Sequence, residues 1–157
     1  MKLTDVFKIV NWFRVTSNAE MRTYDAEELT QMKVMKLLYY VQGTYLALRS
    51  EKAFPNDILA WRYGPVVREV HDKYSGQTGI VGNISDDKTA QHDYESIEPS
   101  SDLGIVLKAV WLTFGDKSAI ELMKQTHEER PWKETEQSDI ISPDLMEDYF
   151  KAEVVKQ

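Results

Sequence analysis

The sequence predicts a mainly α-helical protein, a compact single-domain helical bundle over residues 1–157 with at most one small sheet. Three observations support this prediction. Apolar residues recur at helical spacing in several segments, residues that favour helix starts precede most of these segments, and strand-like alternation is confined to one short stretch. A domain of about 150 residues buries roughly 68 to 70% of its unfolded surface, so one self-sufficient core is expected.

The N-terminal part is predicted to contain two helices. The first begins beside Thr4, whose side-chain oxygen can accept backbone N–H groups, and carries apolar residues as far as Phe13. Residues 16–28 are polar and are predicted to form a connection. The second helix runs from Thr30 to Leu48, and its apolar residues extend beyond one face, which predicts a central helix. Its remaining stripe combines two lysines with small residues that admit another backbone: Lys33, Lys36, Tyr40, Gly43 and Ala47.

The middle of the chain contains turn signals and the only strand-like pattern. Gly64 and Pro65 predict an abrupt turn that opens a new helix, because glycine tolerates unusual backbone angles and proline suits the first helical position. Residues 58–63, before this turn, could form a short strand or one turn of helix. Residues 80–98 alternate in character around an acidic cluster and are predicted to form a small β-hairpin or an irregular excursion.

Helical signals return in the last third of the chain. A helix is predicted from Ser101, with apolar residues on one face and a stop at Gly115. Residues 118–121 match a capping box, in which a serine and a glutamate satisfy each other's backbone N–H groups. A serine followed by a proline at residues 142–143 predicts the start of the last helix.

Composition excludes several classes of protein. The chain has no cysteine, so neither a disulfide framework nor a thiolate metal site is available. It also has no signal-peptide pattern and no uncharged apolar run of membrane-spanning length, which predicts a soluble cytoplasmic protein with no membrane partner. The net charge of −7 opposes general attraction to nucleic acid or anionic lipid.

The charge is unevenly distributed along the sequence. Residues 30–74 carry seven basic and four acidic side chains, a balance of +3, whereas residues 127–157 carry four basic and nine acidic ones, a balance of −5. This asymmetry could be an ordinary solvated surface, or it could steer a protein partner. Lys33 and Lys36 lie one helical turn apart, so they could meet an acidic partner or form part of a solvated stripe.

Enzyme chemistry has little support in the sequence. Three histidines are the only side chains whose ordinary pKa lies near neutrality, and none stands in a recognised catalytic or metal-binding motif. His127 precedes two glutamates, but a helical zinc motif needs a second histidine at the position of Pro131. Phosphate-binding glycine loops, nucleophile elbows and paired acidic metal motifs are also missing from the sequence. We therefore expect no enzymatic activity, no metal and no cofactor.

Two short segments stand out for their residue types. Arg62 lies between Trp61 and Tyr63, so it could stack and pair internally, or it could anchor a partner, since these three types are frequent among interface hot spots. Residues 126–132 crowd polar side chains against a Pro-Trp helix start. They could form a structural turn, or their histidine and Glu129 could build a polar pocket with Arg62 in which carboxylate meets guanidinium.

Three segments, in order, resemble the Panacea-domain family of phage-associated and SocA-like antitoxins. They are a Thr-Gln-x-Lys-x-x-Lys-Leu-Leu-Tyr-Tyr helix at 30–40, an Ala-Trp-x-Tyr-Gly-Pro-Val turn at 60–66 and a Thr-His-x-Glu-x-Pro-Trp turn at 126–132. The resemblance spans roughly residues 5–150. The family-motif positions are Thr30, Gln31, Lys36, Leu37, Tyr39, Trp61, Tyr63, Gly64, Pro65, Val66, His127, Glu129, Pro131 and Trp132.

The resemblance implies an antitoxin that binds and neutralises a cognate toxin protein, usually encoded beside it and often on a phage or mobile element. It also implies two alternatives: an adaptor that delivers the toxin to a cytosolic protease, and a regulator of its own operon. Direct nucleic-acid binding is not expected, because a local balance of +3 is small beside the roughly 6 to 10 phosphate contacts of strong binders. The residues expected to contact the partner are Lys33, Lys36, Tyr40, Arg62 and Tyr63.

Overall fold

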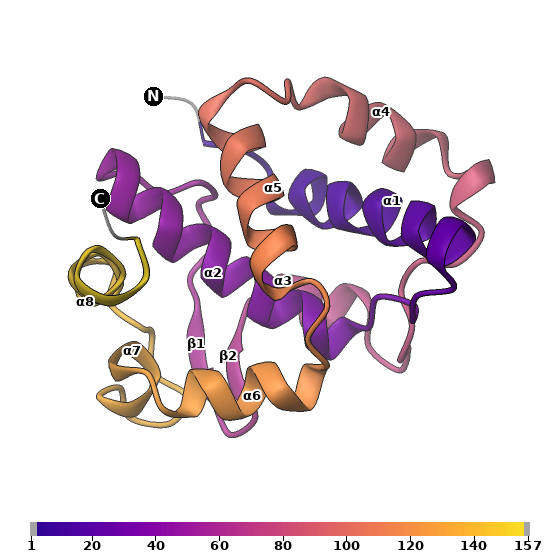
Figure 1. The fold of residues 1–157 in the computed structure, drawn as a ribbon. Coiled ribbons are helices and arrows are strands. Elements are labelled where there is room, and N and C mark those ends of the chain that lie inside the picture. Colours follow the sequence, from indigo (N-terminus) through magenta and orange to yellow (C-terminus); the bar gives the residue numbers. More distant parts are fainter. Residues whose placement is uncertain (1–2, 156–157) are drawn as a thin grey trace.

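The computed structural model of the protein describes residues 3–155, and its helices surround one central helix (Figure 1). Over these residues it has eight α-helices and one two-stranded sheet, which confirms the mainly α class. The helices are α1 (Val6–Tyr24), α2 (Gln31–Arg49), α3 (Arg68–Lys73), α4 (Lys88–Ser96), α5 (Asp102–Phe114), α6 (Ala119–His127), α7 (Arg130–Lys133) and α8 (Pro143–Tyr149). The strands are β1 (Leu59–Trp61) and β2 (Gly64–Val66); shorter helical turns span Ile84–Asp86 and Phe150–Val154.

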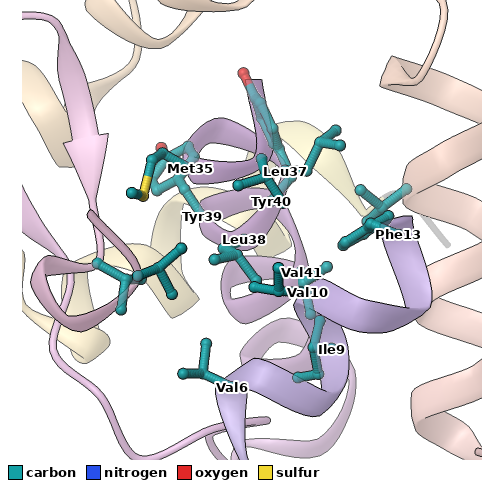
Figure 2. Close-up of a cluster of buried hydrophobic side chains, with 14 of the residues drawn as sticks. Val6, Ile9, Val10, Phe13, Met35, Leu37, Leu38, Tyr39, Tyr40 and Val41 are labelled. Atoms are coloured by element: carbon teal, nitrogen blue, oxygen red, sulfur yellow. The ribbon is translucent and has the colours of Figure 1, made fainter. Parts of the chain in front are cut away.

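Helix α2 is the centre of the fold, as its apolar width predicts. Thr30 caps it by accepting the Lys33 N–H at 3.1 Å, and 12 of its 19 residues are buried. It packs against α5, α6, α8 and β2. Side chains of α1 also point towards it, and Figure 2 shows Ile9 and Val10 beside Val41 in the shared core. Burial on so many sides means that polar residues of α2 must find partners inside the protein.

The small residues of α2 accommodate an aromatic ring. A Cβ at Gly43 would overlap the ring of Phe150, a fully buried residue that follows α8. The small residues of this stripe therefore do admit a close neighbour. That neighbour is the side chain of Phe150, whereas the backbone of another segment was predicted.

The sheet is a hairpin over residues 59–66, whereas the alternating residues of the sequence predict a hairpin at 80–98. Strand β1 pairs antiparallel with β2, and Trp61 lies opposite Gly64, so two residues form the turn. The strand alternative for residues 58–63 is therefore correct. The predicted helix start at Pro65 is wrong, since Pro65 lies in β2 opposite Ala60 and the next helix begins at Arg68.

The prediction of a β-hairpin at residues 80–98 is wrong, because most of this stretch forms helix α4. The Asp87 side chain caps the helix by accepting the Ala90 N–H at 2.9 Å. Ala90 and Ile97 are both buried, seven residues apart, which is two turns of an α-helix. Tyr94 stacks on Trp12 of α1 at 5.9 Å between ring centroids. The true period is helical, and the apparent alternation came from polar residues on the outer face.

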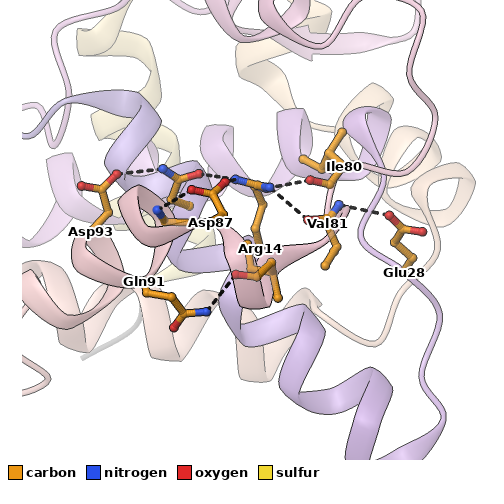
Figure 3. A network of polar contacts seen from close by, with 10 residues as sticks. Arg14, Glu28, Ile80, Val81, Asp87, Gln91 and Asp93 are labelled. Carbon is orange, nitrogen blue, oxygen red and sulfur yellow. Dashed lines mark hydrogen bonds and ion pairs between the residues drawn. The ribbon is translucent and has the colours of Figure 1, made fainter.

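A polar network ties the segment before α4 to the first helix (Figure 3). Arg14 donates to the carbonyl of Ile80 at 2.6 Å and to that of Val81 at 3.0 Å, and it pairs with Asp87 at 3.0 Å. Glu28 accepts the Val81 N–H at 3.0 Å. These bonds satisfy backbone groups that lie in no helix or strand, so the segment has a fixed course.

Most predicted helix caps are present, including Thr30, but the ends of the first helix differ. The capping box at residues 118–121 and the serine cap at 142 are present. Helix α1, however, is capped by Asp5 and continues to Tyr24, so the predicted connection at 16–28 is mostly helix. The buried Ser17 hydroxyl accepts the Leu29 N–H at 3.0 Å, which shows why a polar residue faces the core. Across the described residues, no helix has the length and apolarity needed to cross a membrane.

Candidate functional site

Segments from three parts of the chain pack together beside helix α2. Helix α2 contacts β2 and α6, and α6 contacts β2 and α7, an arrangement visible in Figure 1. Two side chains of the acidic and basic residue types are buried where these elements meet, Glu129 and Lys36, which are 5% and 1% exposed. Because burying a charge is unfavourable unless it is paired, the surroundings of each residue indicate its role.

Glu129 has hydrogen-bond donors on both carboxylate oxygens. Its Oε1 accepts from the Tyr39 hydroxyl at 2.9 Å, and its Oε2 accepts from the Tyr40 hydroxyl at 2.8 Å and from the Gln125 amide at 3.5 Å. Burial raises the pKa of Glu129 above its usual value, while the three hydrogen bonds oppose that rise. Burial first, and then Glu129, raise the pKa values of Tyr39 and Tyr40. The carboxylate thus joins α2 to the start of α7.

Aromatic rings enclose this carboxylate. Tyr40 stacks on Phe114 of α5, with centroids 3.9 Å apart and ring planes at 14°. Phe150 packs against Tyr39 at 5.3 Å and Tyr40 at 6.0 Å. Such contacts remove water from the carboxylate and hold the two hydroxyls in place. This part of the site is therefore rigid and closed.

Lys36 has no comparable partner. No carboxylate of the described residues lies within 4.0 Å of its ammonium. Its stem passes directly beside Gly64: a Cβ there would lie 2.9 Å from Lys36 Cε and 3.4 Å from Nζ. Gly64 also has a φ of +114°, so two constraints favour glycine. Burial lowers the pKa of Lys36 to about 8.

The α6–α7 turn is joined to the hairpin by two aromatic residues. His127 stacks on Trp132, with centroids 3.9 Å apart and planes at 18°. The Trp132 indole donates to the Trp61 carbonyl at 2.9 Å. His127 Nε2 is buried and makes no hydrogen bond to the described residues. Burial lowers the pKa of His127, and nearby Lys36 lowers it further, so the neutral ring is favoured.

An apolar depression opens beside Lys36, and we call it the Lys36 pocket. Its volume is about 540 Å³. Met32, Tyr63 and Ile120 are exposed by 40%, 54% and 59% and surround it as a rim. The complete lining is Thr30, Gln31, Met32, Met35, Lys36, Trp61, Tyr63, Val66, His71, Gln77, Thr78, Ala119 and Ile120. Large apolar side chains rarely gather around an exposed hollow without a function in binding.

The family model described as "Antitoxin SocA-like, Panacea domain" matches residues 34–133. The chain belongs to the SocA-like Panacea family. This match includes Lys36, Glu129, the hairpin and the whole segment 126–132, and it covers the lining of the pocket except Thr30, Gln31 and Met32. Searches among curated proteins and among solved structures gave no match.

Several Panacea motif positions have a structural placement. Gln31 donates to the Tyr74 carbonyl at 2.7 Å and so holds the end of α3 against the start of α2. Leu37 is fully buried in the core and Val66 lies in β2. Pro131 is buried in the first turn of α7. These residues shape the region around the pocket.

The residues predicted to contact a partner are not on one surface. Tyr40 is buried against Glu129, and Lys36 is buried beside Gly64. Lys33 donates to the carbonyl of Gly115 and lies 5.6 Å above the ring of Trp111, away from Lys36. The two lysines therefore do not form one exposed stripe. Direct contact of any of these residues with a partner stays a prediction.

The hairpin turn is the exposed part of the predicted set. Arg62 and Tyr63 are both exposed, and the Arg62 guanidinium lies 5.5 Å from the Tyr63 ring. The polar pocket predicted between Arg62, His127 and Glu129 is not formed, because Glu129 is bonded to tyrosines and has no ion pair with Arg62.

Sequence reasoning missed the apolar rim. Met32 belongs to the apolar residues that extend beyond one face of the second helix and so predict burial, and Ile120 alone does not indicate a rim. A usable signal was present for Ile120, since it stands inside the capping box at 118–121, where the first helical turn is commonly exposed. The convergence of α2, the hairpin and α6 could be known only from the fold.

Proposed function

We propose that this Panacea domain is an antitoxin that neutralises a toxin protein by direct binding, with the Lys36 pocket as its contact surface. Membership of the SocA-like family supports an antitoxin role. The observation that carries the proposal is the rim of Met32, Tyr63 and Ile120, three large exposed side chains around one apolar hollow. Patches of this kind are typical of protein interaction sites.

Neutralisation of this kind requires no chemistry from the antitoxin. A toxin seated on the rim would lose access to its own target, and the proposal places both proteins in the cytoplasm. The closed Glu129 cluster supports this mechanism, because it fixes α7 and, through the Trp132 bond to Trp61, the hairpin wall of the pocket. A surface whose walls are already ordered loses less entropy on binding.

The test is co-expression with the product of the adjacent gene, in the wild type and in two matched variants. Ile120→Asp places a carboxylate on the rim, and Ile105→Asp places one on α5, where the exposed fraction is similar at 53% but no part of the pocket is formed. We expect the wild type and Ile105→Asp to rescue growth and co-purify with the toxin. Ile120→Asp should bind at least about tenfold more weakly, or about 1.4 kcal/mol.

Three results would contradict the proposal. If the product of the adjacent gene is not toxic to the cells and forms no complex with this protein, the antitoxin role is contradicted. Equal binding by both variants would move the interface away from the pocket, and equal loss would show a general effect of added charge. Toxin half-life, measured in the same cells, separates neutralisation from delivery to a protease, because neutralisation leaves the half-life unchanged.

A further inference from the structure

The Lys36 pocket combines an apolar lining with a buried cation. Lys36 is 1% exposed and lines the pocket, and among the described residues its ammonium has no carboxylate within 4.0 Å. An unpaired buried charge is strongly unfavourable unless something outside the chain compensates it. Glu129, by contrast, accepts hydrogen bonds from Tyr39 and Tyr40, so its buried carboxylate has partners within the protein.

The pocket lining also carries no negative charge. Of the described residues that line it, none is an aspartate or glutamate, although the protein has a net charge of −7. Lys36 and His71 are its ionisable members besides Tyr63. The lining therefore offers a cation and no carboxylate of its own, although Asp72 lies 3.3 Å from His71 Nδ1, and this composition favours an anionic group beside Lys36.

We infer that the Lys36 pocket recognises a carboxylate attached to an apolar group, which the toxin presents as a side chain or as its chain terminus. This inference rests on the proposed function, since it names the chemistry of the toxin group that enters the same pocket. The carboxylate pairs with the Lys36 ammonium, and the attached apolar group packs between Trp61, Met35 and Ile120.

The lining distinguishes this ligand from other anions. A phosphate group is heavily hydrated and would lose that hydration against methionine, valine and isoleucine side chains without enough donors to replace it. A carboxylate needs fewer donors, and one ammonium supplies a charge-assisted hydrogen bond. The volume of about 540 Å³ lies in the range of sites that enclose a small ligand, which is ample for two aliphatic side chains.

The pairing should depend on pH. Burial lowers the pKa of Lys36 to about 8, so affinity for a carboxylate should fall as the pH rises above that value. Other groups face the same region: His71 from α3, His127 at the end of α6 and Tyr63 from the hairpin turn. A titration of Lys36→Met, which keeps these three groups, separates their contribution from that of Lys36.

The experiment uses peptide probes and the intact protein. Acetyl-Leu-Leu with a free carboxyl terminus is compared with its C-terminal amide, and acetyl-Leu-Glu amide carries the carboxylate on a side chain. Binding is followed at millimolar concentration by the NMR signals of the Trp61 indole and the Ile120 amide. We expect a carboxylate probe to bind about tenfold more tightly than the amide, which is the effect of one charge-assisted hydrogen bond.

The variants distinguish pairing between Lys36 and a carboxylate from simple apolar binding. Lys36→Met should bind the acid and the amide equally, and Ile105→Asp should behave as the wild type. The preference of the wild type should disappear between about pH 7 and about pH 9.5, which tests Lys36 without any substitution. Equal binding of acid and amide by the wild type, shifts confined to other surfaces, or no binding by any probe would overturn the inference. The better of the two acids identifies the side chain or the terminus as the source.

The inference and the proposed function fail in different ways. If Ile120→Asp abolishes the toxin complex but no probe shows a carboxylate preference, the toxin binds at the rim without the Lys36 contact. If the preference is found but the product of the adjacent gene does not bind, the pocket chemistry is correct and the antitoxin role is wrong.

Discussion

Two ionisable side chains are buried beside the same helix, and they differ in how their charge is satisfied. Glu129 accepts hydrogen bonds from Tyr39, Tyr40 and Gln125, so donors within the fold offset part of the cost of burying its carboxylate. Lys36 has no such partner among the described residues and faces an apolar pocket with an exposed rim. Both are motif positions, and we expect opposite roles for them: the first should stabilise the fold, and the second is proposed to bind a partner.

The largest effect is expected from Glu129→Ala. This change leaves the hydroxyls of Tyr39 and Tyr40 buried without an acceptor, and each such group costs about 1 to 3 kcal/mol. The free energy of unfolding should therefore fall by roughly 3 to 5 kcal/mol, which urea denaturation measures.

Glu129→Gln is the matched control for that change. Its amide can still accept from one tyrosine and donate to the other, so the loss should stay below about 1 kcal/mol. The variant also tests the charge. Burial raises the pKa of Glu129, so the wild type should lose stability as the pH rises above the unfolded value of 4.5, and the Gln variant should lack this loss. An Ala variant as stable as the Gln variant would show that the cluster contributes little.

Lys36→Met should have the opposite sign and a slightly smaller size. The pKa of Lys36 falls from 10.5 to about 8 on folding, so burying its charge costs roughly 3 kcal/mol below about pH 8. Methionine is of similar length and carries no charge, so the variant should be more stable at neutral pH by up to that amount. Thermal or urea unfolding at neutral pH measures the gain.

The pH dependence gives an independent measurement of the same group. Between about pH 8 and about pH 10.5 the unfolded chain keeps the Lys36 proton and the folded chain has lost it, so the wild type should gain stability as the pH rises. Ionisation of tyrosines in the unfolded chain limits the useful range to below about pH 10. Lys36→Met should show no such gain. If Lys36→Met is less stable than the wild type, Lys36 has a stabilising partner in the folded protein, and its contrast with Glu129 is wrong.

The fold could be predicted from the sequence wherever local signals agree with tertiary packing. The capping box at 118–121, the serine cap at 142 and the central place of the second helix follow from residue types at fixed spacing, and the structure confirms them. Two local signals failed. Pro65 suits a helix start, but pairing with Ala60 places it in a strand, and the apparent alternation near Tyr94 hides a helix that packs on α1. In both places the deciding contacts are distant in sequence.

The site was harder to predict than the fold. Family resemblance pointed to segments that pack together in the structure, and Lys36 and Glu129 are both among the residues that it gave. What it could not give is burial: Lys36 appears on a lysine-bearing helical stripe, yet Gly64 and the hairpin cover it. The apolar rim needed the fold as well, because Met32, Tyr63 and Ile120 come from three elements.

Gly43→Ala should have an intermediate effect on stability, and the effect should be confined to the buried cluster around Glu129. The added Cβ would overlap the buried Phe150 ring, which packs on Tyr39 and Tyr40. Overpacking costs about 1 to 3 kcal/mol, and the better helix propensity of alanine offsets up to about 1 kcal/mol, so a net loss of roughly 1 to 2 kcal/mol is expected. If the ring moves and admits water, the Glu129 pKa, measured by NMR, should also fall towards its usual value. A stabilised variant would show that Phe150 can shift freely and does not enclose the carboxylate.

Trp132→Phe should have the smallest effect on stability. It is also the variant that best tests whether the Glu129 cluster and the Lys36 pocket are coupled, because Trp132 connects these two regions. Its ring stacks on His127, two residues before Glu129 in the chain, and its indole donates to the carbonyl of Trp61, which lines the Lys36 pocket. Phenylalanine keeps a stacking ring but removes the donor, so a loss of about 1 kcal/mol is expected. If the closed cluster positions the open pocket through this bond, the Trp61 indole signal should shift and binding of the acetyl-Leu-Leu probe should weaken, while the Glu129 pKa stays as in the wild type. An unchanged pocket would mean that the hairpin is held by α2 and α6 alone, and that the two regions share a helix but act independently.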